Sequence, residues 1–118
     1  MTKPASGAGE DRRARQSSTA IRARIEAARD RQRQRLAHFG LHANAAMAAR
    51  HIRKFCPLDD AGRQLLETVT DRLGLSARTY SRILKVARTI ADLAGSDAIE
   101  QPHLAEAIQY RGLDRKTA

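Results

Sequence analysis

The chain has 118 residues, 3% of them aromatic, and abundant Ala, Leu and Arg, which fits one small helical domain and argues against a β-sheet fold. No apolar run approaches the roughly 20 residues that cross a membrane, and no signal-peptide segment follows Met1. The single Cys56 excludes an internal disulfide. We therefore expect a cytoplasmic protein without a membrane partner. The formal net charge of +9 resides entirely in residues 1–54, which hold 13 Lys or Arg against 4 Asp or Glu, and this asymmetry indicates an anionic partner at one surface.

The first predicted helix follows a polar N-terminal segment. Residues 1–16 contain Pro, Gly, Ser and mixed charge without apolar periodicity, and we expect them to form a disordered basic tail before a helical domain of residues 17–118. The helix is predicted to begin at Ser17 or Ser18, either of which can cap its first turn, and to end at Gly40. Its narrow apolar stripe consists of Ile21, Ile25, Ala28, Gln32 and Leu36.

Two shorter helices are predicted next. Asn44 is expected to cap a short helix over residues 45–53. Asp59 is a suitable N-cap for a helix over residues 60–73, which we expect to end at Gly74. The predicted core face of this second helix consists of Leu65, Leu66, Val69 and Leu73.

The clearest amphipathic pattern follows Ser76, another suitable N-cap, and extends to about Ala94. Apolar side chains recur there at the i, i+3, i+4, i+7 spacing of a buried face, namely Tyr80, Ile83, Leu84, Ala87, Ile90, Ala91 and Ala94. The opposite face is predicted to carry Arg78, Arg82, Lys85, Thr89 and Asp92.

The last helix is predicted from Pro102, which suits a first helical turn because its missing N–H is not needed there, to about Gly112. Ile99 should pack inward before it, and Leu104, Ala107 and Ile108 should anchor it. The sequence therefore predicts an all-α fold, a small antiparallel helical bundle of four main helices and one minor helix, since short connections place neighbouring helices side by side.

The segment LSARTYSRILKVARTIADLAG, followed by IEQPHLAEAIQYRGLDR, resembles the C-terminal lid of the Mg-chelatase-like AAA+ ATPases of the ComM type. The resemblance extends from about Ser17 to Arg115. It implies a helical lid that lies beside an AAA+ core, with ATP and Mg²⁺ bound in the full-length parent. It also implies that the core domain, neighbouring subunits of a ring and DNA are partners of the lid.

Arg78 is the residue to which the resemblance assigns a role, because the matching arginine of the family is the sensor-2 arginine that contacts nucleotide phosphate. A cation in the first turn of a helix is mildly disfavoured by the helix dipole, and a bound phosphate would reverse that balance. Arg82, Lys85 and Arg88 extend the cationic stripe, either as contacts to phosphate or to a neighbouring subunit, or as a solvated helix face. Asp92 could pair with Arg88 at i, i+4.

The arginines of the first helix form a second candidate site. They could lie along the phosphates of a nucleic acid, or they could be an ordinary exposed helix face, and no aromatic motif accompanies them. The candidate contacts are Arg22, Arg29, Arg31, Arg33 and Arg35.

Catalytic and metal-binding motifs are missing from the sequence. No GxxxxGK[ST] phosphate loop occurs, so we expect the isolated chain to bind no cofactor and to hydrolyse no ATP. The resemblance implies that the chain is a fragment or domain of an ATP-hydrolysing AAA+ protein. The histidines and Cys56 match no metal-ligand pattern, and no metal site is expected. Two alternatives remain: a free-standing basic helical protein that binds nucleic acid, and an adaptor that docks on an AAA+ ring.

Overall fold

A computed structural model describes the backbone of residues 3–117 and the side chains of residues 17–110. The described residues form five α-helices and two 3-10 turns without a strand, which confirms the all-α fold class. In chain order the elements are α1 (Lys3–Leu36), η1 (Ala37–Phe39), η2 (Asn44–Ala46), α2 (Ala49–Phe55), α3 (Asp60–Leu73), α4 (Ala77–Leu93) and α5 (Gln101–Thr117). None of the described helices is long and apolar enough to cross a lipid bilayer.

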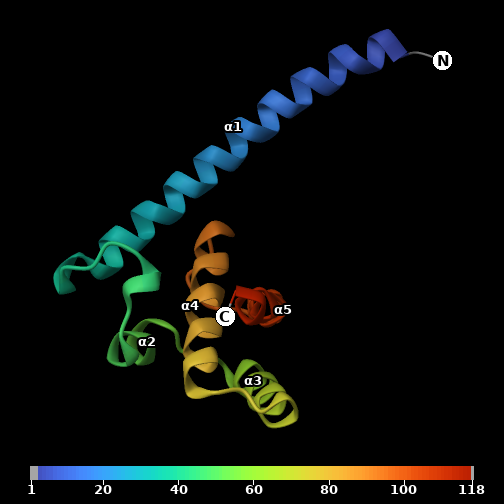
Figure 1. The fold of residues 1–118 in the computed structure, drawn as a ribbon. Helices are drawn as coiled ribbons and strands as arrows, with labels where there is room; N and C mark the ends of the chain where they lie inside the picture. The colour runs from blue at the N-terminus through green and yellow to red at the C-terminus, as the bar shows by residue number, and fades with distance from the viewer. Residues whose placement is uncertain (1–2, 118) are drawn as a thin grey trace.

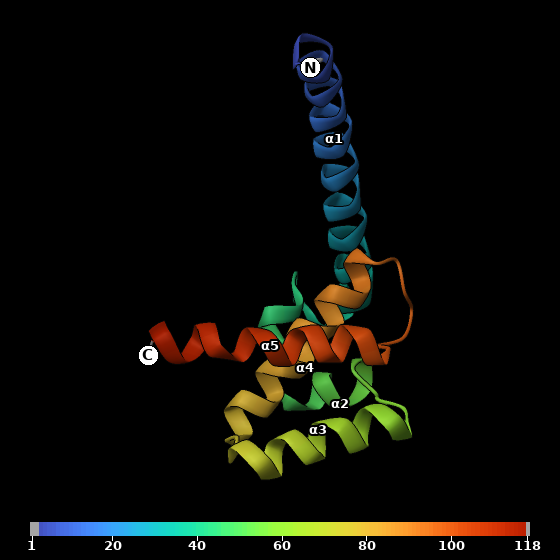
Figure 2. The ribbon, with the colours of Figure 1, turned by 90° about the vertical axis from the view of Figure 1, so that its right-hand side faces the viewer.

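Helix α4 lies at the centre of the fold and packs against α1, α2, η2 and α5, while α3 packs against α5. Figure 1 shows α5 end-on beside an upright α4, and Figure 2 shows α5 lengthwise across it, so these two helices cross steeply. The N-terminal half of α1 extends away from the other helices in both views. The face of α4 that α5 leaves uncovered is therefore bordered by α1, η2 and α2.

Helix α1 is continuous from Lys3, so its expected start at Ser17 or Ser18 is wrong. Residues 10–16 are mostly Arg, Glu, Ala and Gln, which favour a helix, and no Gly or Pro separates them from Ser17. Residues 1 and 2 lie outside the described backbone, and the side chains of residues 3–16 are not described. The domain boundary after residue 16 stays a prediction.

The buried stripe of α1 is shorter than the sequence predicts. Ala28 and Leu36 are buried, whereas Ile21 and Ile25 are 45% and 38% exposed and line an open cavity together with residues of α4 and α5. The helix ends at Leu36, and η1 continues the turn to Gly40, whose φ of 71° is the left-handed conformation that glycine adopts most easily.

Asn44 does not cap a helix, which corrects the sequence prediction. It begins η2 and is 1% exposed. The N-cap of α2 is Ala48, whose N–H donates to Nδ1 of His51 at 2.9 Å. The Asn44 side chain is instead occupied by polar partners on α1 and α4, which are described below.

Helix α3 has the predicted cap, since Oδ1 of Asp59 accepts the Gly62 N–H at 2.7 Å. It ends as expected at Gly74, where φ is 61°. Leu66 is completely buried, but Leu73 is 46% exposed in the last turn, contrary to its predicted core position.

Helix α4 also has its predicted cap, because Oγ of Ser76 accepts the Thr79 N–H at 3.1 Å. Most of its predicted core positions are buried or half-buried, although Ala94 is exposed. The inward positions of the C-terminal segment are confirmed for Ile99, Leu104, Ala107 and Ile108. Helix α5 continues to Thr117, past its expected end near Gly112.

Cys56 supplies a test of this core. The thiol is buried, and burial raises its pKa from 9.0 to about 11. At pH 8 the native thiolate fraction should be about a hundredfold lower than in the unfolded chain, so alkylation by iodoacetamide should be slower by at least that factor. Mass spectrometry of quenched samples in buffer and in urea measures both rates, and equal rates would contradict the packing of α2 against α4.

Candidate nucleotide-phosphate site

Three of the cations predicted on α4 line one groove. Arg78, Arg82 and Lys85 surround an open cavity of about 510 Å³ together with Ala45 of η2. The other lining residues, also on α4, are Val86, Thr89 and Ile90. The groove thus has cations along the first half of α4 and an uncharged wall farther along the helix.

Arg78 is exposed in the first turn of α4, as the sequence predicts. It has no hydrogen-bond or ion-pair partner among the described side chains. Its charge lies at the positive end of the helix dipole, and no carboxylate within residues 17–110 pairs with it. An anion at this end of the groove would be attracted both by the guanidinium and by the helix terminus.

Arg82 and Lys85 line the groove one and two turns after Arg78 on α4. Arg82 is exposed, whereas the half-buried Lys85 donates from Nζ to the carbonyl oxygen of Ala45 at 3.2 Å. This bond joins α4 to η2 across the groove. An ammonium group keeps two further donors when it makes one hydrogen bond, so Lys85 can also contact a ligand.

Arg88 is buried, which corrects the sequence prediction that it extends the exposed cationic stripe. It is 3% exposed and donates to the carbonyl oxygens of Asp97 at 2.9 Å and Ser96 at 2.8 Å. Burial lowers the pKa of its guanidinium, and the neighbouring Asp92 carboxylate acts in the opposite direction. Arg88 therefore holds the connection between α4 and α5 and does not face the groove.

Asp92 is also buried, contrary to the solvent-facing position that the sequence predicts. Its carboxylate lies 3.3 Å from Arg88, which confirms the predicted i, i+4 pair, and 2.6 Å from Arg35 on α1. Asn44 adds a hydrogen bond from Nδ2 to Asp92 at 2.9 Å. One carboxylate thus joins α1, η2 and α4.

This buried network also fixes the wall of the groove. Asn44 donates from Nδ2 to Oγ1 of Thr89 at 3.0 Å, and its backbone N–H donates to Oε1 of Gln32 at 2.9 Å. Thr89 lines the groove, and Ala45, the residue after Asn44, lines it opposite. The network centred on Asp92 therefore sets the position of η2 relative to the cationic face of α4.

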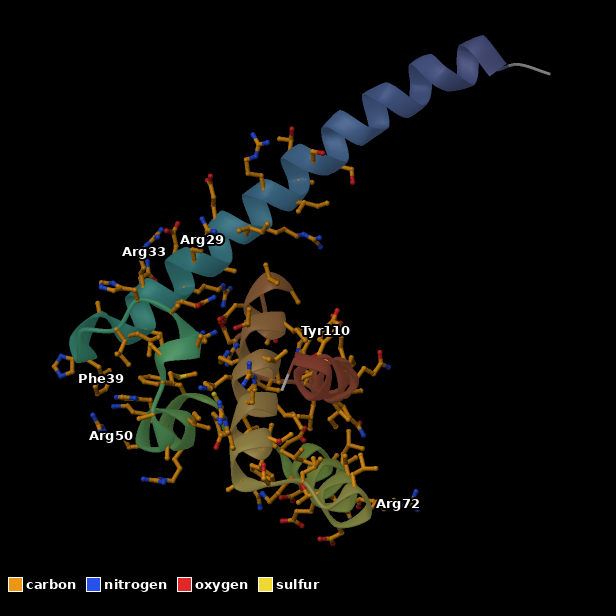
Figure 3. The ribbon with its side chains drawn as sticks, in the orientation of Figure 1. Arg29, Arg33, Phe39, Arg50, Arg72 and Tyr110 are labelled. Atoms are coloured by element: carbon orange, nitrogen blue, oxygen red, sulfur yellow. The ribbon has the colours of Figure 1, made fainter. Side chains whose placement is uncertain are left out.

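The five candidate nucleic-acid arginines of α1 do not act as one set. Arg35 is tied to Asp92, Arg31 donates to Asp97 at 2.9 Å and to the Gly95 carbonyl at 3.1 Å, and Arg33 pairs with Asp30. Arg22 and Arg29 are exposed and have no ion-pair partner within residues 17–110. Figure 3 shows Arg29 and Arg33 on the side of α1 that faces away from α4.

Comparisons with known proteins confirm the family resemblance that the sequence indicates. The family model for the magnesium chelatase subunit ChlI C-terminal region matches residues 15–111. Uncharacterized protein YifB of Escherichia coli is 44% identical over 100 residues, which are 85% of this chain and 19% of that protein. Competence protein ComM of Haemophilus influenzae is 51% identical over 72 residues, which are 61% of this chain and 14% of ComM.

A more distant relative, uncharacterized protein Mb2921c of Mycobacterium bovis, is 32% identical over 96 residues, 81% of this chain and 19% of that protein. No solved structure matches the chain. The chain spans less than a fifth of the length of each of these relatives. Because the family model covers most of its residues, the chain belongs to the magnesium chelatase ChlI C-terminal family, the C-terminal domain of Mg-chelatase-like proteins such as ComM.

Proposed function

We infer that this domain is the lid of a Mg-chelatase-like AAA+ ATPase and that its groove receives the phosphates of ATP held by the AAA+ core. Arg78 acts as the sensor-2 arginine, and Arg82 and Lys85 add positive charge beside it. ATP and Mg²⁺ are bound in the full protein, which forms a ring whose neighbouring subunits contact the lid, and the whole motor acts on DNA.

The observation that carries this proposal is the convergence of Arg78, Arg82 and Lys85 on one open groove. Cations that are spread over a solvated helix face need not share a cavity. Here a guanidinium without a described partner lies at a helix N-terminus, where phosphate oxygens bind best. Hydrogen bonds join η2 to Lys85, Thr89 and Asp92 of α4, and donors held in this way favour binding of a phosphate group.

A nucleotide-affinity measurement tests the role of Arg78. The protein is the Escherichia coli relative with its matching segment replaced by residues 15–111 of this chain, because we expect the remainder of that relative to supply the AAA+ core. Arg78→Ala should weaken binding of a slowly hydrolysed ATP analogue about tenfold to a hundredfold, since one charge-assisted hydrogen bond contributes about 1.5–3 kcal/mol. Fluorescence titration should show less than about a twofold change for ADP, which lacks the γ-phosphate.

The matched control is Arg72→Ala, which removes an exposed arginine from α3, on the other side of the domain from α1 in Figure 3. Neither nucleotide should respond to this change. An equal loss for ATP and ADP in Arg78→Ala would contradict the γ-phosphate contact.

A further inference from the structure

The positive charge on the outer side of α1, η1 and α2 is not confined to the arginines of α1. From Arg31 to Leu58 the chain contains six Lys or Arg and no Asp or Glu. Two of those six form ion pairs, Arg31 with Asp97 and Arg35 with Asp92. The remaining positive charge therefore lies mostly on α2.

Three cations of α2 are exposed, namely Arg50, Arg53 and Lys54. None of them has a carboxylate partner in the described part of the chain. Arg29 of α1 is likewise exposed without such a partner. We define the α1–α2 basic surface as these four cations together with Phe39, the last residue of η1.

Phe39 places an aromatic ring among these cations. It is half-buried, and its ring centroid lies 5.0 Å from that of His51 and 5.7 Å from that of Phe55, in edge-on arrangements. Nζ of Lys54 lies 5.5 Å from the Phe39 centroid, at cation–π distance. Figure 3 shows Arg29, Arg33, Phe39 and Arg50 along one margin of the molecule, while Arg72 and Tyr110 lie elsewhere.

We propose that the α1–α2 basic surface binds single-stranded DNA. Unpaired cations on adjacent helices can follow a phosphate backbone, and a fixed, partly exposed ring can stack a base that is not paired in a duplex. A duplex would offer only its backbone to this surface, since its bases are already stacked. That the strand is DNA rests on the proposed function, in which the parent motor acts on DNA.

Fluorescence anisotropy of the full 118-residue chain with labelled oligothymidylate tests the proposal. The double variant Arg50→Gln/Arg53→Gln should weaken binding about tenfold at low salt, and its plot of log affinity against log salt should be shallower by about 1.4, that is, about 0.7 for each lost phosphate contact. The matched control Arg63→Gln/Arg72→Gln removes the same charge from α3 and should leave both quantities unchanged. Equal losses in the two double variants would overturn the proposal.

A second variant tests the aromatic contact. Phe39→Leu should weaken single-strand binding about tenfold and leave binding of a duplex of equal length within about twofold, because stacking serves only unpaired bases. Circular dichroism checks that this variant is folded, and if it is not, the double variants still decide the question. Duplex bound as tightly as the single strand by the parent chain would overturn the single-strand assignment.

The two proposed sites can fail independently. In the core-containing protein, the Escherichia coli relative that carries residues 15–111 of this chain, Arg50→Gln/Arg53→Gln should leave the ATP affinity unchanged. In the 118-residue chain, Arg78→Ala should leave the oligothymidylate affinity unchanged. Loss of DNA binding in Arg78→Ala equal to that in the α2 double variant would contradict a separate α1–α2 basic surface.

Discussion

Replacing Asp92 by alanine is expected to lower the free energy of unfolding by about 3–5 kcal/mol, the usual cost of removing one partner from a buried ion pair. The Asp92 side chain has no exposed area, and it neutralises both Arg35 and Arg88, whose side chains are 13% and 3% exposed. The variant would leave two guanidinium groups in the interior without a counter-charge. Urea denaturation followed by circular dichroism measures the change.

Asp97→Ala is the matched control, because it also removes an aspartate that pairs with an α1 arginine. The Asp97 side chain is 99% exposed and lies 2.9 Å from Arg31. Surface ion pairs contribute at most about 1 kcal/mol, so this variant should unfold close to the parent. If Asp92→Ala were as stable as Asp97→Ala, the buried network would not hold α1 to α4 as the structure indicates.

The second large effect is expected in catalysis. In the core-containing protein, Arg78→Ala should lower the turnover number for ATP about a hundredfold to a thousandfold at saturating ATP and Mg²⁺. The physical reason is that a guanidinium aimed at the γ-phosphate stabilises charge that develops in the transition state. Steady-state phosphate release measures the rate.

Stability measurements separate this effect from a folding defect. Arg78 is exposed, so its truncation opens no cavity and should change the free energy of unfolding by less than about 0.5 kcal/mol. Arg72→Ala should match the parent in both turnover and stability. If Arg78→Ala hydrolysed ATP at the parental rate, the sensor-2 role would be wrong and the cationic face of α4 would be an ordinary solvated helix surface.

The features that local chemistry determines were predictable from the sequence. Asp59 and Ser76 cap their helices because each side chain needs only the backbone N–H three residues ahead. The buried face of α4 follows from its apolar spacing, and the placement of Arg78 on the opposite side follows with it. The sequence did not predict that η2 and the cations of α4 line the same groove, because Ala45 is far from α4 in the sequence.

The buried charges were not predictable by the same argument. Periodicity assigns Arg88 and Asp92 to a polar face, and a polar face is expected to meet water unless another element covers it. Here α1 and η2 supply Arg35 and Asn44 across that face. One signal was present: Gln32 interrupts the apolar stripe of α1, and a polar residue at a core position requires a polar partner opposite.

The most direct test of the ATP-lid assignment is the distance between the Arg78 guanidinium and the γ-phosphate in a structure of the core-containing protein with Mg²⁺ and a non-hydrolysable ATP analogue. We expect a charge-assisted hydrogen bond of about 2.7–2.9 Å between a guanidinium nitrogen and a γ-phosphate oxygen. Arg82 and Lys85 should border the same phosphate group. A nucleotide fully bound by the core, with the groove of α4 open to solvent and Arg78 remote from every phosphate, would contradict the account.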